Sequence, residues 1–144
     1  MLNNIPKLIS PELLKILCEM GHGDTIVIGD GNFPACSVAA ANGAKLVRAD
    51  GLGAVDLLDA ILALIPLDTY TKENFVLMAT VPGDSEPEIW KDYGYVLAAH
   101  GEKTPPVYVE RFDFYERAKK AYAVIATGET QIYANIILQK GVIK

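Results

Sequence analysis

The sequence is poor in the residues on which metal sites, disulfide scaffolds and membrane spans depend. It has two cysteines, two histidines and one tryptophan among 144 residues. Cys18 and Cys36 lack the spacing of a metal site, and His22 and His100 are seventy-eight positions apart, so we expect no bound metal. We expect both cysteines to be free thiols in a reducing compartment, which favours the cytoplasm.

Long apolar runs and clusters of basic residues are also missing. The longest apolar run covers residues 60–66, far short of the ~20 residues of a membrane-spanning helix. Asn3, Pro6 and Lys7 interrupt any apolar segment near the N-terminus, so no signal peptide is expected. The formal net charge is −5 and the thirteen basic residues are scattered, which argues against nucleic acid as a partner. We expect a protein that binds neither membrane nor nucleic acid.

The glycine-rich loops that hold phosphates are absent too. Neither GxGxxG nor GxxxxGK[ST] occurs, so no nucleotide cofactor is expected. What is present is an ordinary globular composition, with 51% hydrophobic and 22% charged residues. The length predicts a single domain, residues 1–144, that is large enough to enclose a core.

Strand and helix signals alternate along the chain. Apolar runs predict strands at residues 25–28, 46–48, 75–79, 107–111 and 136–138. Helical spacing and end signals predict helices that begin at Ser10-Pro11 and end before Gly21, and further helices near 35–45, 53–65, 89–99 and 113–127, the last closed by Gly128. This alternation predicts an α/β fold with helices packed on a mostly parallel sheet.

Polar residues at the ends of these elements form the candidate site. The stretch GHGDTIVIGDGNFP places His22 before a buried strand and Asp30 after it. In open α/β sheets ligands bind beyond the carboxyl ends of the strands, where Asp30 is expected. For His22 to reach Asp30, residues 21–24 must fold back or a ligand must lie between the two side chains. If each residue is considered separately, His22 is explained by a turn that ends a helix, and Asp30 is explained by a capping role in the next element.

Later residues add to this set. In a strand over residues 107–111, Arg111 would share a face with Val107 and Val109. Placing an arginine there is costly unless its side chain ends at the strand tip beside a polar partner. Tyr133 and Asn135 come just before the last strand.

Other conspicuous residues are interpreted as structural. Asp56 and Asp59 lie three apart on a helix and are expected to face solvent, because no histidine or glycine loop flanks them. We expect Trp90 to pack on the sheet, the alternative being that it covers a ligand.

Several stretches carry more information in combination. They are residues 8–14 (LISPELL), 21–24 (GHGD), 33–34 (FP), 48–51 (RADG), 111–117 (RFDFYER), 127–129 (TGE) and 133–136 (YANI). In this order they resemble the RbsD/FucU family of sugar mutarotases, which includes L-fucose mutarotase and D-ribose pyranase. The resemblance spans nearly the whole chain, and LISPELL, RADG and RFDFYER resemble the L-fucose branch.

The resemblance implies a three-layer, Rossmann-like subunit in a ring-shaped homo-oligomer, often a decamer of two pentameric rings, with sites at subunit contacts. It implies His22 as the catalytic acid/base, and as sugar-binding residues Asp30, Arg111, Tyr133, Ala134 and Asn135. The activity it implies is interconversion of the α and β anomers of L-fucopyranose. Imidazole suits this reaction because it gives and accepts a proton near neutral pH. Asp30 would bind sugar hydroxyls or fix the tautomer of His22, and no cofactor is required.

Three alternatives stay open. One is a D-ribose pyranase that exchanges pyranose and furanose forms. Another is a sugar-binding module without turnover, and the third is a purely structural oligomer. Assembly is also suggested by aromatic residues outside the apolar strand runs, some of which are expected to face a neighbouring subunit. They are Tyr70, Trp90, Tyr93, Tyr95, Tyr108, Phe112, Phe114, Tyr115 and Tyr133.

Overall fold

A computed structural model describes residues 1–144 as five helices and one six-stranded sheet. The helices are α1 (Pro11–Glu19), α2 (Ala35–Asn42), α3 (Ala54–Leu62), α4 (Ile89–Ala99) and α5 (Arg111–Lys119). The strands are β1 (Thr25–Gly29), β2 (Lys45–Ala49), β3 (Phe75–Met78), β4 (Val107–Val109), β5 (Ala123–Thr127) and β6 (Ile136–Gln139).

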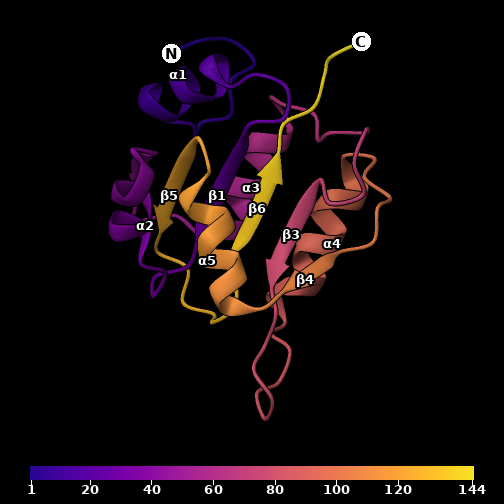
Figure 1. The fold of residues 1–144 in the computed structure, drawn as a ribbon. Helices are drawn as coiled ribbons and strands as arrows, with labels where there is room; N and C mark the ends of the chain where they lie inside the picture. Colours follow the sequence, from indigo (N-terminus) through magenta and orange to yellow (C-terminus); the bar gives the residue numbers. More distant parts are fainter.

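The sheet is mostly parallel, which confirms the prediction. Its order is β2-β5-β1-β6-β3-β4, and only β6 runs antiparallel to its neighbours, β1 and β3. The carboxyl ends of the parallel strands therefore meet at one end of the sheet, opposite the end where both chain termini lie (Figure 1).

Two helical layers cover the sheet and give the expected three-layer arrangement. Residues of α1, α3 and α4 form the larger core with one face of the sheet, and residues of α2 and α5 form a smaller core with the other. The central strand β1 shows how the sheet divides between them, since Ile26 and Ile28 point into the larger core and Val27 into the smaller one.

Helix α1 begins and ends where the sequence predicts. The backbone N–H of Leu13 donates to Ser10 Oγ at 3.1 Å, and Pro11 occupies the first turn, where its missing N–H is not needed. The helix ends at Glu19, with Met20 as its cap, so the chain is free to turn at Gly21–Gly23 before it enters β1.

The prediction of a helix over residues 113–127 is wrong. Helix α5 ends at Lys119, and residues 123–127 form β5, which is fully buried between β1 and β2. A strand buried on both faces reads as a continuous apolar run, and here that run coincided with helical spacing. Gly128 is no helix end. A Cβ there would lie 2.0 Å from the carbonyl oxygen of Asp50, so only glycine allows this close approach.

The strand predicted over residues 107–111 is too long. Strand β4 ends at Val109, because Glu110 caps α5: its Oε2 accepts from the N–H groups of Phe112 at 2.8 Å and Asp113 at 3.2 Å. Arg111 is therefore the first residue of a helix and not the tip of a strand.

Both cysteines are free and exposed, Cys18 on α1 and Cys36 on α2. None of the five helices combines the length and apolar character of a bilayer-spanning segment. Nowhere do three or more His, Cys, Asp or Glu side chains lie close enough together to bind a metal ion.

Candidate active site

Asp30 lies at the carboxyl end of β1 as predicted and is almost completely buried, with 5% of its surface exposed. Its Oδ1 accepts from the N–H of Asn32 at 2.9 Å, while its own N–H donates to Asn135 Oδ1 at 2.8 Å. Burial raises the pKa of the Asp30 carboxyl above its ordinary value, and the hydrogen bond from Asn32 opposes this rise. The site thus holds a desolvated carboxylate that is fixed by its own loop.

Tyr133 and Ala134 connect this loop to β6 in a strained conformation. Tyr133 has a φ of 58°, which is uncommon for a residue with a side chain and recurs at functional sites. Its carbonyl accepts from Trp90 Nε1 at 2.9 Å, and its hydroxyl donates to Asp84 Oδ2 at 2.5 Å, a bond that raises the pKa of the Tyr133 phenol. The carbonyl of Ala134 accepts from the Tyr93 hydroxyl at 2.6 Å. Neighbouring aromatic residues therefore hold the strained backbone in place.

Four of the predicted polar residues border one hollow of about 210 Å³. Asp30, Arg111, Tyr133 and Asn135 supply polar groups together with Asn32, and the apolar walls come from Phe33, Met78, Tyr115 and Ile132. Ala134 is fully buried and takes no part in the lining.

The guanidinium of Arg111 is available at this hollow. Its Cζ lies 4.5 Å from the centre of the Phe112 ring, and it makes no ion pair within the chain. The partner that the sequence led us to expect for Arg111 is thus missing from its own chain. A buried carboxylate, a free guanidinium and apolar walls are what a polyhydroxylated ligand with an apolar face requires.

His22 does not join this hollow. It precedes β1, whose five residues alone span about 17 Å at about 3.3 Å per residue, and Asp30 follows the strand. The Gly21–Gly23 turn does not fold back, because the N–H of Gly23 donates to the carbonyl of Lys140 at 2.9 Å. His22 and Asp30 therefore lie at opposite ends of the sheet, and the expectation that Asp30 fixes the His22 tautomer is wrong within one chain.

The carboxylate beside His22 is Asp68, which the sequence did not single out. His22 Nε2 lies 3.2 Å from Asp68 Oδ2, and Asp68 is buried whereas the His22 side chain is 48% exposed. The hydrogen bond from the N–H of Tyr70 lowers the pKa of Asp68, and the bonds from His22 and Gln139 add to this effect. An Asx turn at Asp68 is readable from sequence, but nothing in the spacing links it to His22.

Two residues interpreted as structural are placed as follows. Trp90 packs against Tyr108 of β4, with ring centres 4.8 Å apart, in agreement with its expected role on the sheet. Asp59 is exposed as predicted, but a histidine does lie beside it: His100 Nε2 is 2.7 Å from Asp59 Oδ1. The reason given for excluding a role of Asp59 was therefore wrong, although the pair lies on the surface of α3 and α4, outside the hollow.

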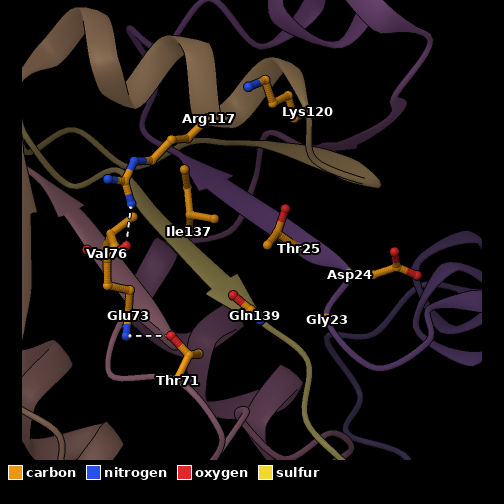
Figure 2. Close-up of a pocket in the computed structure, with 10 residues that line it drawn as sticks. All are labelled: Gly23, Asp24, Thr25, Thr71, Glu73, Val76, Arg117, Lys120, Ile137 and Gln139. Atoms are coloured by element: carbon orange, nitrogen blue, oxygen red, sulfur yellow. Dashed lines mark hydrogen bonds and ion pairs between the residues drawn. The ribbon is translucent and has the colours of Figure 1, made fainter.

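A second hollow of about 330 Å³ lies beside the His22 turn, over β6 and the start of β1 (Figure 2). Two cations line it, Arg117 and Lys120. Arg117 reaches toward Glu73 at 3.0 Å and also contacts Asp113 at 3.3 Å. The charge of Arg117 is thus paired within the chain, whereas Lys120 makes no ion pair there.

The fold and the hollow describe a small α/β protein with a polar hollow at the carboxyl ends of its parallel strands. The sequence profile of the RbsD / FucU transport protein family matches residues 3–143, and the chain belongs to this family.

Named relatives narrow the comparison. The chain is 50% identical to the fucose mutarotase of Homo sapiens over 146 residues, which cover 99% of this chain and 94% of the relative. It is 48% identical to the L-fucose mutarotase of Actinobacillus pleuropneumoniae, over 99% of this chain and 97% of the relative.

Two solved structures of the same family also resemble this chain, one with L-fucose and one with D-ribose. The fucose mutarotase of Streptococcus pneumoniae in complex with L-fucose superposes with a TM-score of 0.94 at 52% identity, over 99% of this chain and 100% of that one. The RbsD of Bacillus subtilis complexed with D-ribose gives a TM-score of 0.74 at 28% identity, over 94% and 95% of the two chains.

Proposed function

We propose that this protein is an L-fucose mutarotase, a cofactor-independent isomerase that interconverts the α and β anomers of L-fucopyranose in the cytoplasm. The observation that carries the proposal is the hollow at the carboxyl ends of the strands, where Asp30 and Arg111 face apolar walls. Support for the sugar comes from the relatives, since those named for fucose share about half of this sequence while the RbsD that binds D-ribose shares 28%. The free, exposed cysteines fit a reducing compartment.

The polar groups of the hollow suit the hydroxyls of one monosaccharide. Asp30 accepts hydrogen bonds, Arg111 donates them, and Asn135 Nδ2, whose contact in the chain is a weak one with Met78 Sδ at 3.8 Å, is left to donate. The apolar walls suit the C–H face and methyl group of a deoxy sugar. Bonds to ionised groups are the stronger ones, so Asp30 and Arg111 are expected to contribute most of the affinity.

His22 is proposed as the acid/base. Ring opening requires removal of the proton from the anomeric hydroxyl and protonation of the ring oxygen as the C1–O5 bond breaks. The resulting aldehyde rotates and closes on its other face, with both proton transfers reversed. The proton count is unchanged, so a single imidazole that accepts one proton and returns it serves the complete cycle.

A complete site then requires two subunits, because His22 and the hollow lie at opposite ends of β1. Exposed apolar side chains gather at these same two ends. Tyr70, Val142 and Ile143 lie at the His22 end, and Val81, Phe112 and Ile132 lie around the hollow. A contact that joins one end to the other is heterologous, and such contacts form a ring when the rotation between successive subunits closes. We therefore propose a cyclic homo-oligomer, a decamer of two pentameric rings on the family resemblance, in which each hollow receives His22 from a neighbour.

The aromatic residues support this assembly only in part. Tyr93 and Phe114 belong to the core of the subunit, with exposed fractions of 1% and 0%, so they cannot face a neighbour. Tyr70 and Phe112 remain exposed, and they lie at the two ends that the proposal joins.

Saturation transfer between the anomeric protons in NMR tests the proposed function. We expect the protein to accelerate exchange of L-fucose more than exchange of D-ribose, and His22→Ala to lose this acceleration while its circular-dichroism spectrum stays unchanged. His100→Ala, which changes the other histidine of the chain, is the matched control and should retain exchange.

Three results would contradict the proposal. Faster exchange of D-ribose would favour the pyranase alternative. Binding of L-fucose without accelerated exchange would favour a binding module, and the absence of binding would favour a structural oligomer.

A further inference from the structure

We propose that Asp84 is a positioning residue of the sugar site: its carboxylate holds the hydroxyl of Tyr133 and thereby fixes the phenol ring that borders the hollow. Asp84 lies in the loop between β3 and α4, residues 79–88, and does not line that hollow itself. The proposal rests on the proposed function and goes beyond it, because it makes this loop a support of the sugar site.

The loop presents Asp84 through a tight turn over residues 81–84. The N–H of Asp84 donates to the carbonyl of Val81 at 3.1 Å, and Gly83 has a φ of 98°. Proline at the second position, here Pro82, and glycine with a positive φ at the third are the signature of a type II turn. Such a turn brings its first and fourth residues together, so Val81 and Asp84 can contact one common partner.

That partner is the hydroxyl of Tyr133. It donates to Asp84 Oδ2 at 2.5 Å, because an ionised carboxylate only accepts, and it accepts a long bond of 3.4 Å from the N–H of Val81. Residues 80–86 make no other hydrogen bond to the remainder of the chain. The loop extends beyond the carboxyl ends of the parallel strands (Figure 1), so the hydroxyl of Tyr133 is the point that attaches its outer part to the site.

Tyr133 requires such an attachment because its backbone is strained. Its φ of 58° persists only where the surroundings hold it, and Trp90 Nε1 does so by donating to the Tyr133 carbonyl at 2.9 Å. This bond fixes the backbone but leaves the side chain free to rotate about its own bonds. The bond to Asp84 fixes the opposite end of the residue, so the ring is held at both ends.

The segment just before Tyr133 is tied to the same loop. Gln131 Oε1 accepts from the N–H of Ile89, the first residue of α4, at 3.0 Å. Ile132 borders the sugar hollow and also a further hollow of about 390 Å³, which Asp84 lines from the loop side. The loop is therefore attached to residues 131–133 at its middle and at its end, and its position bears directly on the wall of the sugar hollow.

These attachments predict an effect on binding and not on the chemical step. A ring that is fixed before the sugar arrives loses no rotational freedom when the sugar binds. The same wall contacts the sugar in its closed form and during ring opening, so releasing the ring weakens both states alike. Loss of the bond between Asp84 and Tyr133 should therefore raise KM and leave kcat nearly unchanged.

Asp84→Ala tests the proposal through L-fucose exchange measured over a range of sugar concentrations. Asp84 is exposed, so the variant is expected to fold. We expect KM to rise about threefold to tenfold while kcat changes less than about twofold. Asp84→Asn keeps an oxygen that can accept from Tyr133 and should lie closer to wild type. Glu86→Ala, which removes another exposed carboxylate of the same loop that does not contact Tyr133, is the matched control and should retain the wild-type KM.

A spectroscopic measurement follows the bond itself. The hydrogen bond to Asp84 raises the pKa of the Tyr133 phenol, so Asp84→Ala should move the titration of Tyr133 to lower pH, whereas Glu86→Ala should not. The titration is measured by NMR of protein labelled with ¹³C at tyrosine Cζ. Tyr133→Phe identifies the signal among the seven tyrosines. Adding Asp84→Ala to Tyr133→Phe should change KM little further, because the shared bond is already lost.

Several outcomes would overturn the inference while the proposed function stands, because the wild type still accelerates exchange. They are an unchanged KM in Asp84→Ala, an Asp84→Asn protein as impaired as Asp84→Ala, an unmoved titration of Tyr133, and additive losses in the double variant. A wild type that does not accelerate exchange of L-fucose would instead reject the proposed function, and the inference with it.

Discussion

Replacing Asp30 with asparagine should make the chain more stable at neutral pH and the proposed enzyme less active. Asparagine keeps an oxygen that can accept from the N–H of Asn32, now 2.9 Å from Asp30 Oδ1, but it removes the buried negative charge. Burial raises the pKa of Asp30 above its ordinary 3.8, which means that ionised Asp30 destabilises the folded chain. Asp30→Asn relieves this cost.

The pH dependence of the stability gained by Asp30→Asn follows from the direction in which burial shifts the pKa of Asp30. Below pH 3.8 Asp30 is protonated whether the chain is folded or unfolded, so wild type and variant should be equally stable. As the pH rises through the folded-state pKa of Asp30, the wild type loses the stability that protonated Asp30 contributes. The variant has no such group and loses nothing. A difference of one in pKa corresponds to about 1.4 kcal/mol. Since hydrogen bonds from Asn32 and the neighbouring backbone offset part of the burial penalty, we expect a gain on the order of 1 kcal/mol or less.

Urea unfolding at equal protomer concentration, at about pH 3 and about pH 7, measures the stability difference. Affinity for L-fucose should fall about tenfold to a hundredfold, because hydrogen bonds to charged groups are worth about 1.5–3 kcal/mol. A variant that is less stable than wild type at neutral pH would refute the reasoning about the buried charge. So would a variant that is more stable than wild type by the same amount at both pH values. Unchanged affinity would instead remove Asp30 from the sugar site.

Two further predictions concern the proposed shared site. Neither His22→Ala nor Arg111→Ala should show full exchange alone. When subunits of the two variants are mixed in equal amounts, about a quarter of the sites should regain exchange, because each site combines the hollow of one subunit with His22 of its neighbour. Mixtures that stay inactive after verified subunit exchange would contradict a shared site. Phe112→Asp places a charge beside the hollow, at a position where the wild-type side chain is 61% exposed. Light scattering should then return a smaller mass, and L-fucose exchange per subunit should fall. Phe112→Leu is the control and should retain the wild-type mass and exchange.

The sequence was sufficient where local signals decide the structure. Ser10 and Pro11 mark the start of α1, and Gly21 marks its end. The strand before Asp30 is likewise readable, because its short apolar run lies between two glycine-rich turns. Both elements keep the structure that their residues prefer locally.

It was insufficient where a contact depends on strand pairing. Strand β5 is buried between β1 and β2, so its sequence shows no alternation, and the helical spacing of Phe114, Ala118 and Ala121 continues into it at Ile125. The contact of His22 with Asp68 joins residues forty-six positions apart, and only the antiparallel return of β6 brings them together. Such partners cannot be identified from the spacing of a single sequence.

The stretch GHGDTIVIGD has a consequence for how this protein works. It is contiguous in sequence, but β1 separates its two functional ends, so within one subunit His22 and Asp30 cannot act on the same sugar. In the proposed ring each copy of the stretch serves two sites, with His22 completing the hollow of one neighbour and Asp30 lining the hollow that the other neighbour completes. The rigidity of β1 then fixes the distance between successive sites. Activity therefore depends on assembly through the backbone of one strand, and mutations at the subunit contacts are expected to act on turnover without touching the sugar.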